Sequence, residues 1–576
     1  MKDDSISQEI TTWLEGPIDP FTKKEIESSL KSHPQKLEKA FSEKLSFGTG
    51  GIRALVGIGS SYLNPYTIAR VTQGVANYLL QHPTKGRPLR VVIGYDNRKT
   101  SRPFAEVVAE VFSANGIEAY LFSTLKPTPV VSFACIYYHA KAAVMITASH
   151  NPPEYNGYKL YWEDGGQVVP PHDQGVIKEI EKLEMFSDVK RRKDPSLIQE
   201  IPENFDSIYL ESLKTTSLRP KENQKEGKEL KIIYTGLHGT GNEMTPKALA
   251  SWGFSSVTLV PKESKVDPEF TYAPNPNPES KDALKNGSSL LLQKKADLLL
   301  ANDPDADRIG LVVFHKDQAY HFSGNQIASM LLHYIFQNHK TLPDNAAFVK
   351  TIVTTELFSK ICEKEKKACF DVLTGFKYIA QKIHEWEQTK EYTFIFGAEE
   401  SLGYLLHSLT RDKDGVQACC LIAEMAFWCK EQGKDLYDYL LQIYEEYGVF
   451  RESQISIKYP QGQEGIRSMK NKMNALRRSP LSYLNQTKVC VWEDFLHKES
   501  IDLFTEQRSP LFLPKSDVLR FFLEDQTKIV IRPSGTEPKI KIYLAVQKEQ
   551  GPVLSSMKEC DQKLKSLEKL LKKEFE

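Results

Sequence analysis

Several features that mark other classes of protein are missing from this sequence. The chain contains 75 Lys and Arg residues and 75 Asp and Glu residues, so its formal net charge is zero. It therefore has no global positive field that would attract nucleic acid or an anionic membrane. No apolar run approaches the roughly 20 residues of a membrane-spanning helix, and the N-terminal sequence contains no apolar signal core. We expect no nucleic-acid partner and no membrane partner.

Cysteine is scarce. The chain has eight cysteines, none of them in a C-x-x-C pair, and most lie in apolar segments. This distribution indicates reduced thiols in the core and argues against a disulfide framework or a cysteine-ligated metal cluster. The sequence therefore predicts a reducing, cytoplasmic location.

Length and composition predict a globular protein of several domains. At roughly 100–200 residues per domain, 576 residues correspond to about three to five domains. Apolar residues make up 40% and charged residues 26%, which is typical of a chain that buries a core. Residues 1–45 have the pattern of amphipathic helices, with Thr22 as a plausible N-cap, and indicate an extension packed on the first domain.

One pattern then occurs three times along the chain. Each round has three buried strands with helices between them and ends in a polar loop, which is typical of mostly parallel sheets with right-handed crossovers. After Gly448 the pattern changes to short strands and polar helical stretches. We expect an α/β protein of three tandem mixed or parallel-sheet domains of similar topology, with a C-terminal α+β domain, around a central cleft. The expected domains are 1–205, 206–323, 324–447 and 448–576.

The loop after the apolar segment Ala142–Ile146 contains a candidate nucleophile. This segment is typical of a buried parallel strand, and the Asn-Pro-Pro and Asn-Gly that follow it stop regular structure. Ser149 should therefore occupy a tight loop at the carboxyl end of a strand, where open α/β sheets bind ligands. His150 is adjacent and Lys159 is a short loop away. We interpret Ser149 as a candidate nucleophile, and an ordinary serine-rich turn is the alternative.

Two glycine-rich segments could approach a ligand closely. F-G-T-G-G-I-R ends in Arg53, whose guanidinium could bind phosphate, and a plain turn with a surface arginine is the alternative. T-G-L-H-G-T-G, residues 235–241, suggests a turn that cradles phosphate, although its spacing matches neither G-x-G-x-x-G nor G-x-x-x-x-G-K-[ST]. Within it, His238 is a candidate acid, base or phosphate donor, and a histidine that packs the loop fits equally well.

The hexapeptide D-P-D-A-D-R, residues 303–308, predicts a metal site. It follows the apolar strand Leu298–Ala301, and its three alternating carboxylates can converge on one hard cation. A calcium loop would need Gly in place of Arg308 and Glu in place of Phe314, so Mg²⁺ fits better. An exposed acidic turn is the alternative, but three like charges after a buried strand repel each other without a neutralising partner.

Two further loops carry side chains suited to a phosphorylated sugar. In G-A-E-E-S, Glu399 and Ser401 offer acceptors and a donor for hydroxyl groups, although Glu-Glu-Ser could instead cap a following helix. R-P-S-G-T-E-P contains a compact set of phosphate donors, for which a plain hairpin turn is the alternative. These donors are Arg532, Ser534, Thr536 and the Gly535 backbone.

The loops complement each other for one reaction. A cation held by the three aspartates would touch a phosphoryl group on Ser149 and neutralise charge as that group moves. The hydroxyl-binding residues would hold a sugar, and the last loop would hold the non-reacting phosphate of that sugar.

Together these motifs resemble a known family. T-A-S-H-N-P, D-P-D-A-D-R, G-A-E-E-S and R-P-S-G-T-E-P, in this order between about residues 40 and 545, resemble the motifs of the α-D-phosphohexomutases, the phosphoglucomutase/phosphomannomutase family. F-G-T-G-G-I-R and R-D-K-D-G-V are similar to the branch that holds glucose- and pentose-specific mutases. One departure is Ala54, where the family often has Gly; it concerns the backbone near Arg53 and not the reaction.

The resemblance implies a role for each motif. Ser149 would be the phosphoserine of the active enzyme, and Mg²⁺ would bind one of its phosphate oxygens together with Asp303, Asp305 and Asp307. A sugar bisphosphate such as glucose 1,6-bisphosphate would turn around between two half-reactions, in each of which Ser149 gives or takes one phosphoryl group. The residues implied at the centre, some as proton carriers, are Arg53, His150, Lys159, His238, Arg308 and Lys377. The residues implied to bind the sugar and its distal phosphate are Glu399, Ser401, Arg532, Ser534, Gly535, Thr536 and Lys541.

The sequence favours a mutase acting on glucose 1-phosphate and leaves the sugar open. Glucose, mannose and pentose phosphates differ by single hydroxyls or one carbon, and pocket shape discriminates between them. Phosphopentomutase, phosphomannomutase, glucose-1,6-bisphosphate synthase and phosphatase activities are therefore alternatives. A non-catalytic sugar-phosphate sensor is disfavoured because the nucleophile and metal loop are intact. We expect a monomer or a dimer.

Overall fold

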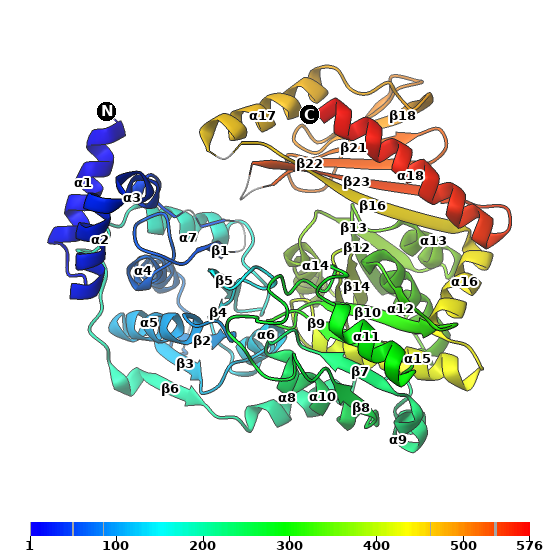
Figure 1. Ribbon diagram of the computed structural model, residues 1–576, viewed down its shortest axis with the longest axis horizontal. Coiled ribbons are helices and arrows are strands. Elements are labelled where there is room, and N and C mark those ends of the chain that lie inside the picture. Colours follow the sequence, from blue (N-terminus) through cyan, green and yellow to red (C-terminus); the bar gives the residue numbers. More distant parts are fainter. Residues whose placement is uncertain are drawn as a thin grey trace. The chain divides into compact units, whose positions relative to one another are not determined.

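The computed structural model describes residues 2–45, 47–48, 51–84, 86–460, 462–534 and 538–575 (Figure 1). The chain forms two compact units. The first unit comprises Met1–His321, Ala380–Gln388 and Gly403–Phe427. The second unit comprises Phe322–Ile379, Thr389–Leu402 and Trp428–Glu576.

The N-terminal extension is helical, as the sequence predicts. Its helices are α1 (Lys2–Glu15), α2 (Pro20–Ser32) and α3 (Pro34–Phe41). The fully buried Trp13 packs edge-on against Phe41 and Tyr66. The predicted cap at Thr22 is wrong: helix α2 begins one turn earlier, where the Asp19 carboxylate accepts the N–H groups of residues 21 and 22. Proline at the first helical position fixes this start, because its ring presets φ and it has no N–H to satisfy.

A six-stranded mixed sheet forms the core of the first α/β layer, in the order β1-β5-β4-β2-β3-β6. Strand β2 pairs in parallel with β3 and β4, whereas β5 is antiparallel to both β1 and β4. Its strands are β1 (Gly51–Leu55), β2 (Arg90–Tyr95), β3 (Glu118–Phe122), β4 (Ala142–Ile146), β5 (Tyr155–Trp162) and β6 (Ile198–Ile201). The three strands that the sequence predicts for this round are confirmed as β2, β3 and β4. Strands β1, β5 and β6 were not predicted; for β5, Asn-Pro-Pro and Asn-Gly had suggested irregular structure where the chain forms a strand.

Helices cover both faces of this sheet (Figure 1). Helices α4 (Pro65–Gln81), α5 (Ser101–Ala114) and α7 (His172–Glu181) share one apolar core with the alternate β2 residues Val91, Ile93 and Tyr95. Helix α6 (Thr128–Tyr137) packs on the opposite face, where a Cβ at Gly94 would lie 2.2 Å from Val131. This two-sided burial explains why the central strand β4 is apolar throughout and β2 nearly so.

The second sheet has the strand order β11-β10-β9-β7-β8. Strands β7 (Ile232–Thr235), β8 (Val257–Leu259) and β9 (Leu298–Asn302) are parallel, as predicted. The chain then reverses into β10 (Ile309–His315) and β11 (Gln318–His321). The helices of this part are α8 (Phe205–Lys214), α9 (Pro220–Glu226), α10 (Gly241–Ser251) and α11 (Lys285–Lys294), and short 3₁₀ turns cover Pro195–Leu197 and Gly227–Glu229.

In the second unit, β12 (Ala346–Thr351) lies between two parallel strands, β13 (Ala368–Val372) and β14 (Thr393–Glu399). These are the three strands that the sequence predicts for the third round. Along the chain they alternate with α12 (Gly324–Asn338), α13 (Glu356–Lys364) and α14 (Phe376–Thr389), and are followed by β15 (Gly403–Leu406), α15 (Gly415–Glu431) and α16 (Leu436–Tyr447).

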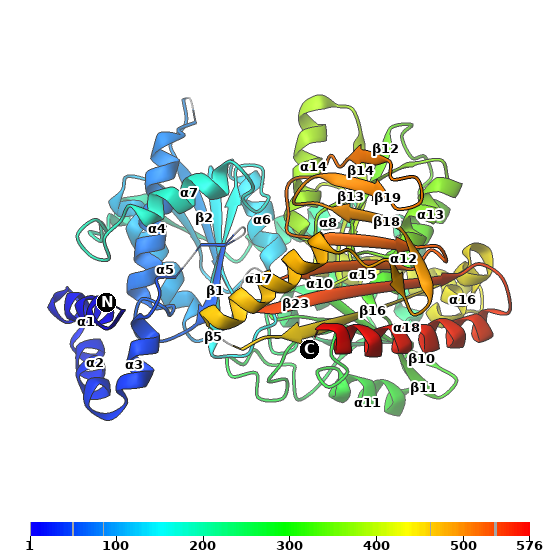
Figure 2. The same cartoon turned by 90° about the horizontal axis from the view of Figure 1, so that it is seen from above.

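The C-terminal part is an antiparallel sheet with two long helices, as the α+β prediction requires. The strand order is β16-β23-β22-β21-β18-β19-β20, and β17 pairs with β18. Helix α18 (Val553–Phe575) lies along β16 and β23 (Figure 2). The remaining elements are β16 (Val449–Lys458), α17 (Gln463–Arg478), β17 (Tyr483–Leu484), β18 (Thr487–Asp494), β19 (Glu499–Asp502), β20 (Arg508–Pro510), β21 (Leu519–Leu523), β22 (Lys528–Pro533) and β23 (Lys539–Lys548). Among the described helices, none has both the length and the apolar character to cross a membrane.

Candidate active site

Ser149 lies in a tight loop at the carboxyl end of β4, as the sequence predicts. Every residue of β4 is buried, and Ser149 itself has a φ of 52°, in the left-handed region. The Ser149 N–H donates to the Thr147 hydroxyl oxygen at 2.8 Å, and the Thr147 hydroxyl donates to Asp96 at 2.7 Å. Such a backbone conformation persists only when its surroundings hold it in place. The hydrogen bonds from Ser149 to Thr147 and from Thr147 to Asp96 contribute to this.

Arg98 supplies most of the remaining support, and sequence reasoning missed it. Its guanidinium pairs with the Asp96 carboxylate at 3.0 Å, and both side chains are fully buried. The terminal nitrogens of Arg98 donate at 2.7–3.0 Å to four carbonyls of the nucleophile loop. Those carbonyls belong to Ser149, Asn151, Pro152 and Tyr155. The planar guanidinium of Arg98 therefore holds the nucleophile loop in place through several hydrogen bonds at once.

His150 stands beside the candidate nucleophile. Its Nδ1 lies 3.2 Å from the Ser149 hydroxyl oxygen. Burial, together with the positive charges of Arg308 and Arg53, lowers the pKa of His150 well below its usual value. The imidazole is therefore neutral near pH 7 and can accept a proton at this position.

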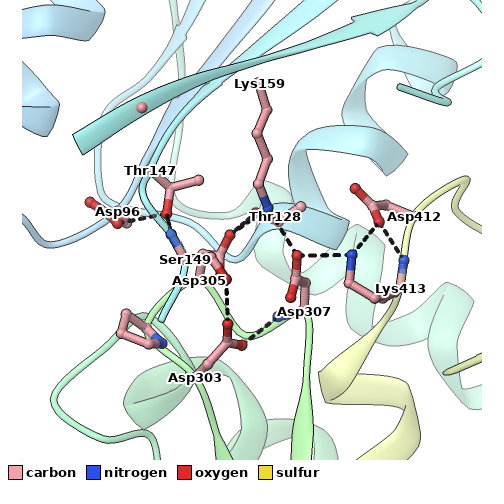
Figure 3. A network of polar contacts seen from close by, with 12 residues as sticks. Asp96, Thr128, Thr147, Ser149, Lys159, Asp303, Asp305, Asp307, Asp412 and Lys413 are labelled. Atoms are coloured by element: carbon pink, nitrogen blue, oxygen red, sulfur yellow. Dashed lines mark hydrogen bonds and ion pairs between the residues drawn. The ribbon is translucent and has the colours of Figure 1, made fainter. Parts of the chain in front are cut away.

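The three aspartates after β9 converge on one point beside Ser149 (Figure 3). The Ser149 hydroxyl donates to Asp303 at 2.8 Å, and ligand oxygens of Asp303, Asp305 and Asp307 all lie within 4.8 Å of one another. All three side chains are buried, and the second carboxylate oxygens of Asp305 and Asp307 have no hydrogen-bond partner. Burial and the two neighbouring carboxylates raise the pKa of Asp303 well above its usual value. Buried, unpaired carboxylate oxygens at this spacing fit a hard divalent cation.

Two lysines hold the aspartates together. The Lys159 ammonium contacts Asp305 at 2.8 Å and Asp307 at 2.9 Å, and the Lys413 ammonium contacts Asp307 at 3.2 Å (Figure 3). Lys159 reaches the site from β5, where it pairs with Met145 of β4. Burial alone would raise the pKa of Asp307, but the two ammonium groups hold it below its usual range. Lys413 lies in R-D-K-D-G-V. In the sequence this motif identified only a branch of the family, and Lys413 was not predicted as a site residue.

Close backbone approaches help to shape the aspartate loop. A Cβ at Gly239 would lie 2.2 Å from the Cα of Pro304, and one at Gly415 would lie 2.6 Å from the carbonyl oxygen of Ala306. Only glycine permits both approaches. The N–H of Thr128, at the start of α6, donates to the Asp305 carbonyl at 2.8 Å. The glycine-rich loop of residues 235–241 therefore cradles the aspartate loop, where the sequence had suggested a phosphate.

His238 has both ring nitrogens engaged by backbone. Its Nδ1 lies 3.0 Å from the carbonyl oxygen of Lys265, and its Nε2 accepts the Tyr272 N–H at 3.2 Å. Because Nε2 accepts, Nδ1 carries the proton and donates. This geometry favours the loop-packing alternative that the sequence left open over a role in proton transfer.

The two arginines implied at the centre lie at the edges of the Ser149 and aspartate loops. Arg53 is on β1, and its guanidinium donates to the Asn151 side-chain oxygen at 2.9 Å. Arg308 follows the aspartates directly, with its Nε 3.9 Å from Asp307 and its Nη1 3.3 Å from Glu279. The first unit thus brings together Ser149, His150, Lys159, Arg53, Arg308 and the three aspartates.

The predicted sugar-binding residues lie in the second unit. Glu399, at the end of β14, is buried and accepts the Gly375 N–H at 2.9 Å. Ser401 is half-buried in the turn that follows β14, so the helix-capping alternative does not apply, since β15 comes next. Lys377, which the resemblance implied at the centre and not as a sugar ligand, is also in this unit; it is buried on α14, with its ammonium 5.1 Å from the centre of the Tyr378 ring.

Three of the predicted phosphate-binding residues, Arg532, Ser534 and Lys541, lie on strands β22 and β23 of the second unit or next to them. Arg532 on β22 pairs in register with Lys541 on β23, and the Ser534 N–H donates to the carbonyl oxygen of Lys539 at 2.8 Å. The Arg532 guanidinium also lies 6.0 Å from the centre of the Tyr543 ring. Gly535 and Thr536, which complete the predicted set, lie outside the described residues.

Comparison with known proteins gives the family. Family models of phosphoglucomutase/phosphomannomutase α/β/α domains I, II and III match residues 44–186, 207–316 and 323–447. A phosphoglucomutase of Staphylococcus haemolyticus is 35% identical over 516 residues, covering 88% of this chain and 91% of that protein. One from Staphylococcus aureus is 36% identical over 519 residues, covering 88% of this chain and 91% of that protein.

Solved structures show the same fold. A putative phosphomannomutase from Thermus thermophilus superposes with a TM-score of 0.66 at 20% identity, covering 91% of this chain and 99% of that one. The open form of a Paramecium phosphoglucomutase gives a TM-score of 0.66 at 16% identity, covering 91% and 95%. The chain therefore belongs to the phosphoglucomutase/phosphomannomutase family, with three α/β domains and a C-terminal β-rich domain. It is a phosphosugar mutase, an intramolecular phosphotransferase.

Proposed function

We propose that this mutase interconverts glucose 1-phosphate and glucose 6-phosphate through a phosphoserine at Ser149. The observation that carries the proposal is the 2.8 Å contact of the Ser149 hydroxyl with Asp303, beside buried carboxylate oxygens that have no partner. Relatives that are 34–36% identical and named phosphoglucomutase support glucose as the sugar. Phosphomannomutase, phosphopentomutase and bisphosphate synthase activities are the alternatives.

In this proposal, Asp303, Asp305 and Asp307 would hold Mg²⁺, which would neutralise charge on the transferring phosphoryl group. A sugar hydroxyl oxygen attacks the phosphorus of phosphorylated Ser149, and the bond from phosphorus to the serine oxygen breaks. The attacking hydroxyl gives up its proton to a neighbouring base, for which the neutral imidazole of His150 is suitably placed, and His150 passes that proton to the leaving serine oxygen 3.2 Å away, which ends as a hydroxyl. The reverse step, on the other end of the same sugar bisphosphate, regenerates the phosphoserine.

The remaining predicted residues have binding roles in the proposal. Lys159 stays charged, because burial opposes its charge but Asp305 and Asp307 raise its pKa above the usual value, so it positions phosphate without supplying a proton. Arg53 and Arg308 contact the transferring group at the rim. Those assigned to the sugar and its distal phosphate are Glu399, Ser401, Arg532, Ser534, Gly535, Thr536 and Lys541. We assign Lys377 to the centre, as the resemblance implies.

The test follows phosphate onto the protein. The chain is incubated with Mg²⁺ and glucose 1,6-bisphosphate, and the modified serine is located by mass spectrometry. We expect phosphate on Ser149, no mutase turnover in Ser149→Ala, and normal turnover in Ser196→Ala, an exposed serine of the same unit. A Ser149→Ala variant with wild-type turnover would refute the assignment.

Initial rates then identify the sugar. Glucose 1-phosphate, mannose 1-phosphate and ribose 1-phosphate are compared, each primed with the matching bisphosphate, and we expect the largest kcat/KM for glucose. Release of inorganic phosphate faster than isomerisation would favour the phosphatase alternative. We also place the protein in the reducing cytoplasm, which the eight unpaired cysteines support. The predicted monomer or dimer is checked by analytical ultracentrifugation.

A further inference from the structure

The side-chain amide of Asn302 joins the two ends of the aspartate loop. Asn302 is the last residue of β9, and it pairs in the antiparallel ladder with Ile309, the first residue of β10. The loop D-P-D-A-D-R, residues 303–308, lies between them. The Nδ2 of Asn302 donates to the carbonyl oxygen of Arg308 at 2.7 Å. The residue before the loop therefore holds the last residue of the loop through its side chain.

The orientation of this amide follows from its partners. A backbone carbonyl oxygen can only accept a hydrogen bond, so the nitrogen of the amide must face Arg308. The Oδ1 of Asn302 accepts the Tyr234 hydroxyl at 2.8 Å and the Thr245 hydroxyl at 2.8 Å, and the sulfur of Cys419 lies 3.6 Å from it. The side chains of Asn302, Tyr234, Thr245 and Cys419 are fully buried. Donors therefore meet the oxygen and an acceptor meets the nitrogen, which fixes one orientation of the amide.

The partners of the Asn302 oxygen belong to three elements outside the aspartate loop. Tyr234 lies on β7, which pairs with β9, whereas Thr245 lies on α10 and Cys419 on α15. Helix α15 begins at Gly415, where a Cβ would lie 2.7 Å from the Nδ2 of Asn302, so the helix backbone packs against the amide. The position of the amide is thus set by the body of the first unit and not by the loop that it holds.

Hydrogen bonds inside the aspartate loop converge on Asp303. One oxygen of its carboxylate accepts the N–H groups of Asp307 at 3.1 Å and of Arg308 at 3.0 Å, and the other accepts the Ser149 hydroxyl. This carboxylate is also one of the three that converge on the candidate cation site. A cation would compete with these bonds for the oxygens of Asp303. The bond from Asn302 to the Arg308 carbonyl uses no carboxylate oxygen, so cation binding does not draw on it.

We propose that Asn302 is a positioning residue of the metal site, which ties the ends of the aspartate loop together so that its three carboxylates are in place before a cation binds. This inference rests on the proposed function, in which the aspartates would hold Mg²⁺. Asn302 acts through the loop, because the nitrogen and the oxygen of its amide both face protein atoms. Partners that orient metal ligands typically change metal affinity by about 10–100-fold. The effect of Asn302 should therefore appear in the affinity for Mg²⁺ and disappear at saturating Mg²⁺.

The experiment titrates the full-length chain with Mg²⁺ alone in a calorimeter. Asn302→Leu keeps a side chain of similar size and removes both polar ends of the amide, and we expect Mg²⁺ to bind about tenfold more weakly. The Mg²⁺ concentration for half-maximal phosphorylation of Ser149 by glucose 1,6-bisphosphate should rise by the same factor, whereas incorporation at saturating Mg²⁺ should stay close to that of the wild type. A merely structural loss would lower incorporation at every Mg²⁺ concentration. Wild-type Mg²⁺ affinity in Asn302→Leu would overturn the proposal.

The matched control is Asn64→Leu. Asn64 is also a buried amide of the first unit, and its Nδ2 donates to the carbonyl oxygens of Gly57 at 3.0 Å and Gly59 at 2.9 Å, which lie outside the aspartate loop. Urea unfolding should show a loss of stability in this variant, and calorimetry should show wild-type Mg²⁺ affinity. If Mg²⁺ affinity falls as far in Asn64→Leu as in Asn302→Leu, general destabilisation explains both losses and the proposal fails.

Two milder variants test whether the neighbours act through the amide. Tyr234→Phe and Thr245→Val each remove one donor to the Asn302 oxygen, and each should weaken Mg²⁺ binding less than Asn302→Leu does. In the Asn302→Leu background, Tyr234→Phe should have no further effect on Mg²⁺ affinity, and a full additional loss would contradict the proposed route. If Asn302→Leu does not fold, the two single variants decide, and wild-type Mg²⁺ affinity in both would refute the inference.

Asp305→Asn distinguishes a failure of this inference from a failure of the proposed function. If Asp305→Asn binds Mg²⁺ as tightly as the wild type, the three aspartates are not the metal site, and both the proposed site and the role of Asn302 are wrong. If Asp305→Asn loses Mg²⁺ binding while Asn302→Leu retains it, the metal site stands and only the role of Asn302 is wrong.

Discussion

Removal of the Arg98 guanidinium tests whether its hydrogen bonds hold the Ser149 loop in its conformation. Arg98→Gln breaks a fully buried ion pair with Asp96 and removes the donors from four loop carbonyls. Leaving one partner of a buried pair unpaired destabilises a protein by about 3–5 kcal/mol. The Ser149 loop then loses its support, and a displacement of about 1 Å at a reacting atom costs about 100-fold in rate. We expect both losses in this variant.

The matched control is Arg90→Gln. Arg90 lies on β2, eight positions before Arg98, and pairs with Glu118 at 2.7 Å, but its side chain is 31% exposed. An exposed pair of this kind contributes less than about 1 kcal/mol. Urea unfolding of both variants gives the difference in the free energy of unfolding, and phosphoryl incorporation at Ser149 gives the difference in chemistry.

The two measurements test separately whether Arg98 stabilises the fold and whether it positions Ser149. If Arg98→Gln loses no more stability than Arg90→Gln, the buried pair with Asp96 is not a support of the fold. If Arg98→Gln is destabilised but phosphorylates Ser149 at the wild-type rate in buffer without urea, the loop does not depend on the guanidinium. Arg98→Lys keeps the charge and loses the planar fork, so we expect it to recover stability more than rate.

Three further predictions concern the aspartate site and its neighbours. Gly239→Ala places a methyl carbon 2.2 Å from the Pro304 Cα, so calorimetry should show Mg²⁺ affinity weakened by about 10–100-fold; unchanged affinity would refute the cradle. Asp412→Asn removes the carboxylate that accepts from the Lys413 ammonium at 3.0 Å, and kcat should fall by about tenfold, whereas a wild-type kcat would contradict this tether. Burial raises the pKa of Asp414 to about 6, so folding favours its protonated form and stability falls by about 3 kcal/mol as pH rises from about 4 to 6. Asp414→Asn should remove that loss in urea titrations across this range, and a variant with the wild-type pH profile would contradict it.

The strands and the two main loops were predictable because their causes are local. A continuous apolar run such as Ala142–Ile146 can only be buried on both faces, and the polar loop after it must then lie at the sheet edge where ligands bind. The same reasoning predicts Asp303 to Asp307 as a convergent set, because alternation along an extended segment is readable from the sequence. The structure places Ser149 and Asp303 in contact at 2.8 Å, as the combination of the two loops requires.

What the sequence did not predict depends on distant contacts. Lys159 was expected a short loop away from Ser149, but the strand that carries it, β5, was not predicted; the chain resumes a strand after the turn and pairs antiparallel with β4. Arg98 follows β2 in D-N-R, an ordinary polar turn by composition, and its role exists only because the Ser149 loop folds over it. The glycines of residues 235–241 indicate a close approach, but not whether a ligand or another loop makes it.

The aspartate site stays assembled because its charges alternate. Three buried carboxylates would repel each other, yet the ammonium groups of Lys159 and Lys413 lie within 3.2 Å of two of them. Asp412 continues the alternation, since it accepts from Lys413 and from the Tyr161 hydroxyl at 2.8 Å. Asp305, Asp307 and Asp412 thus each have a neighbour of opposite sign, and the oxygens of this cluster without a hydrogen-bond partner belong to Asp305 and Asp307. A divalent cation bound there would meet ligands that are already positioned, so its binding energy would not be spent on gathering them.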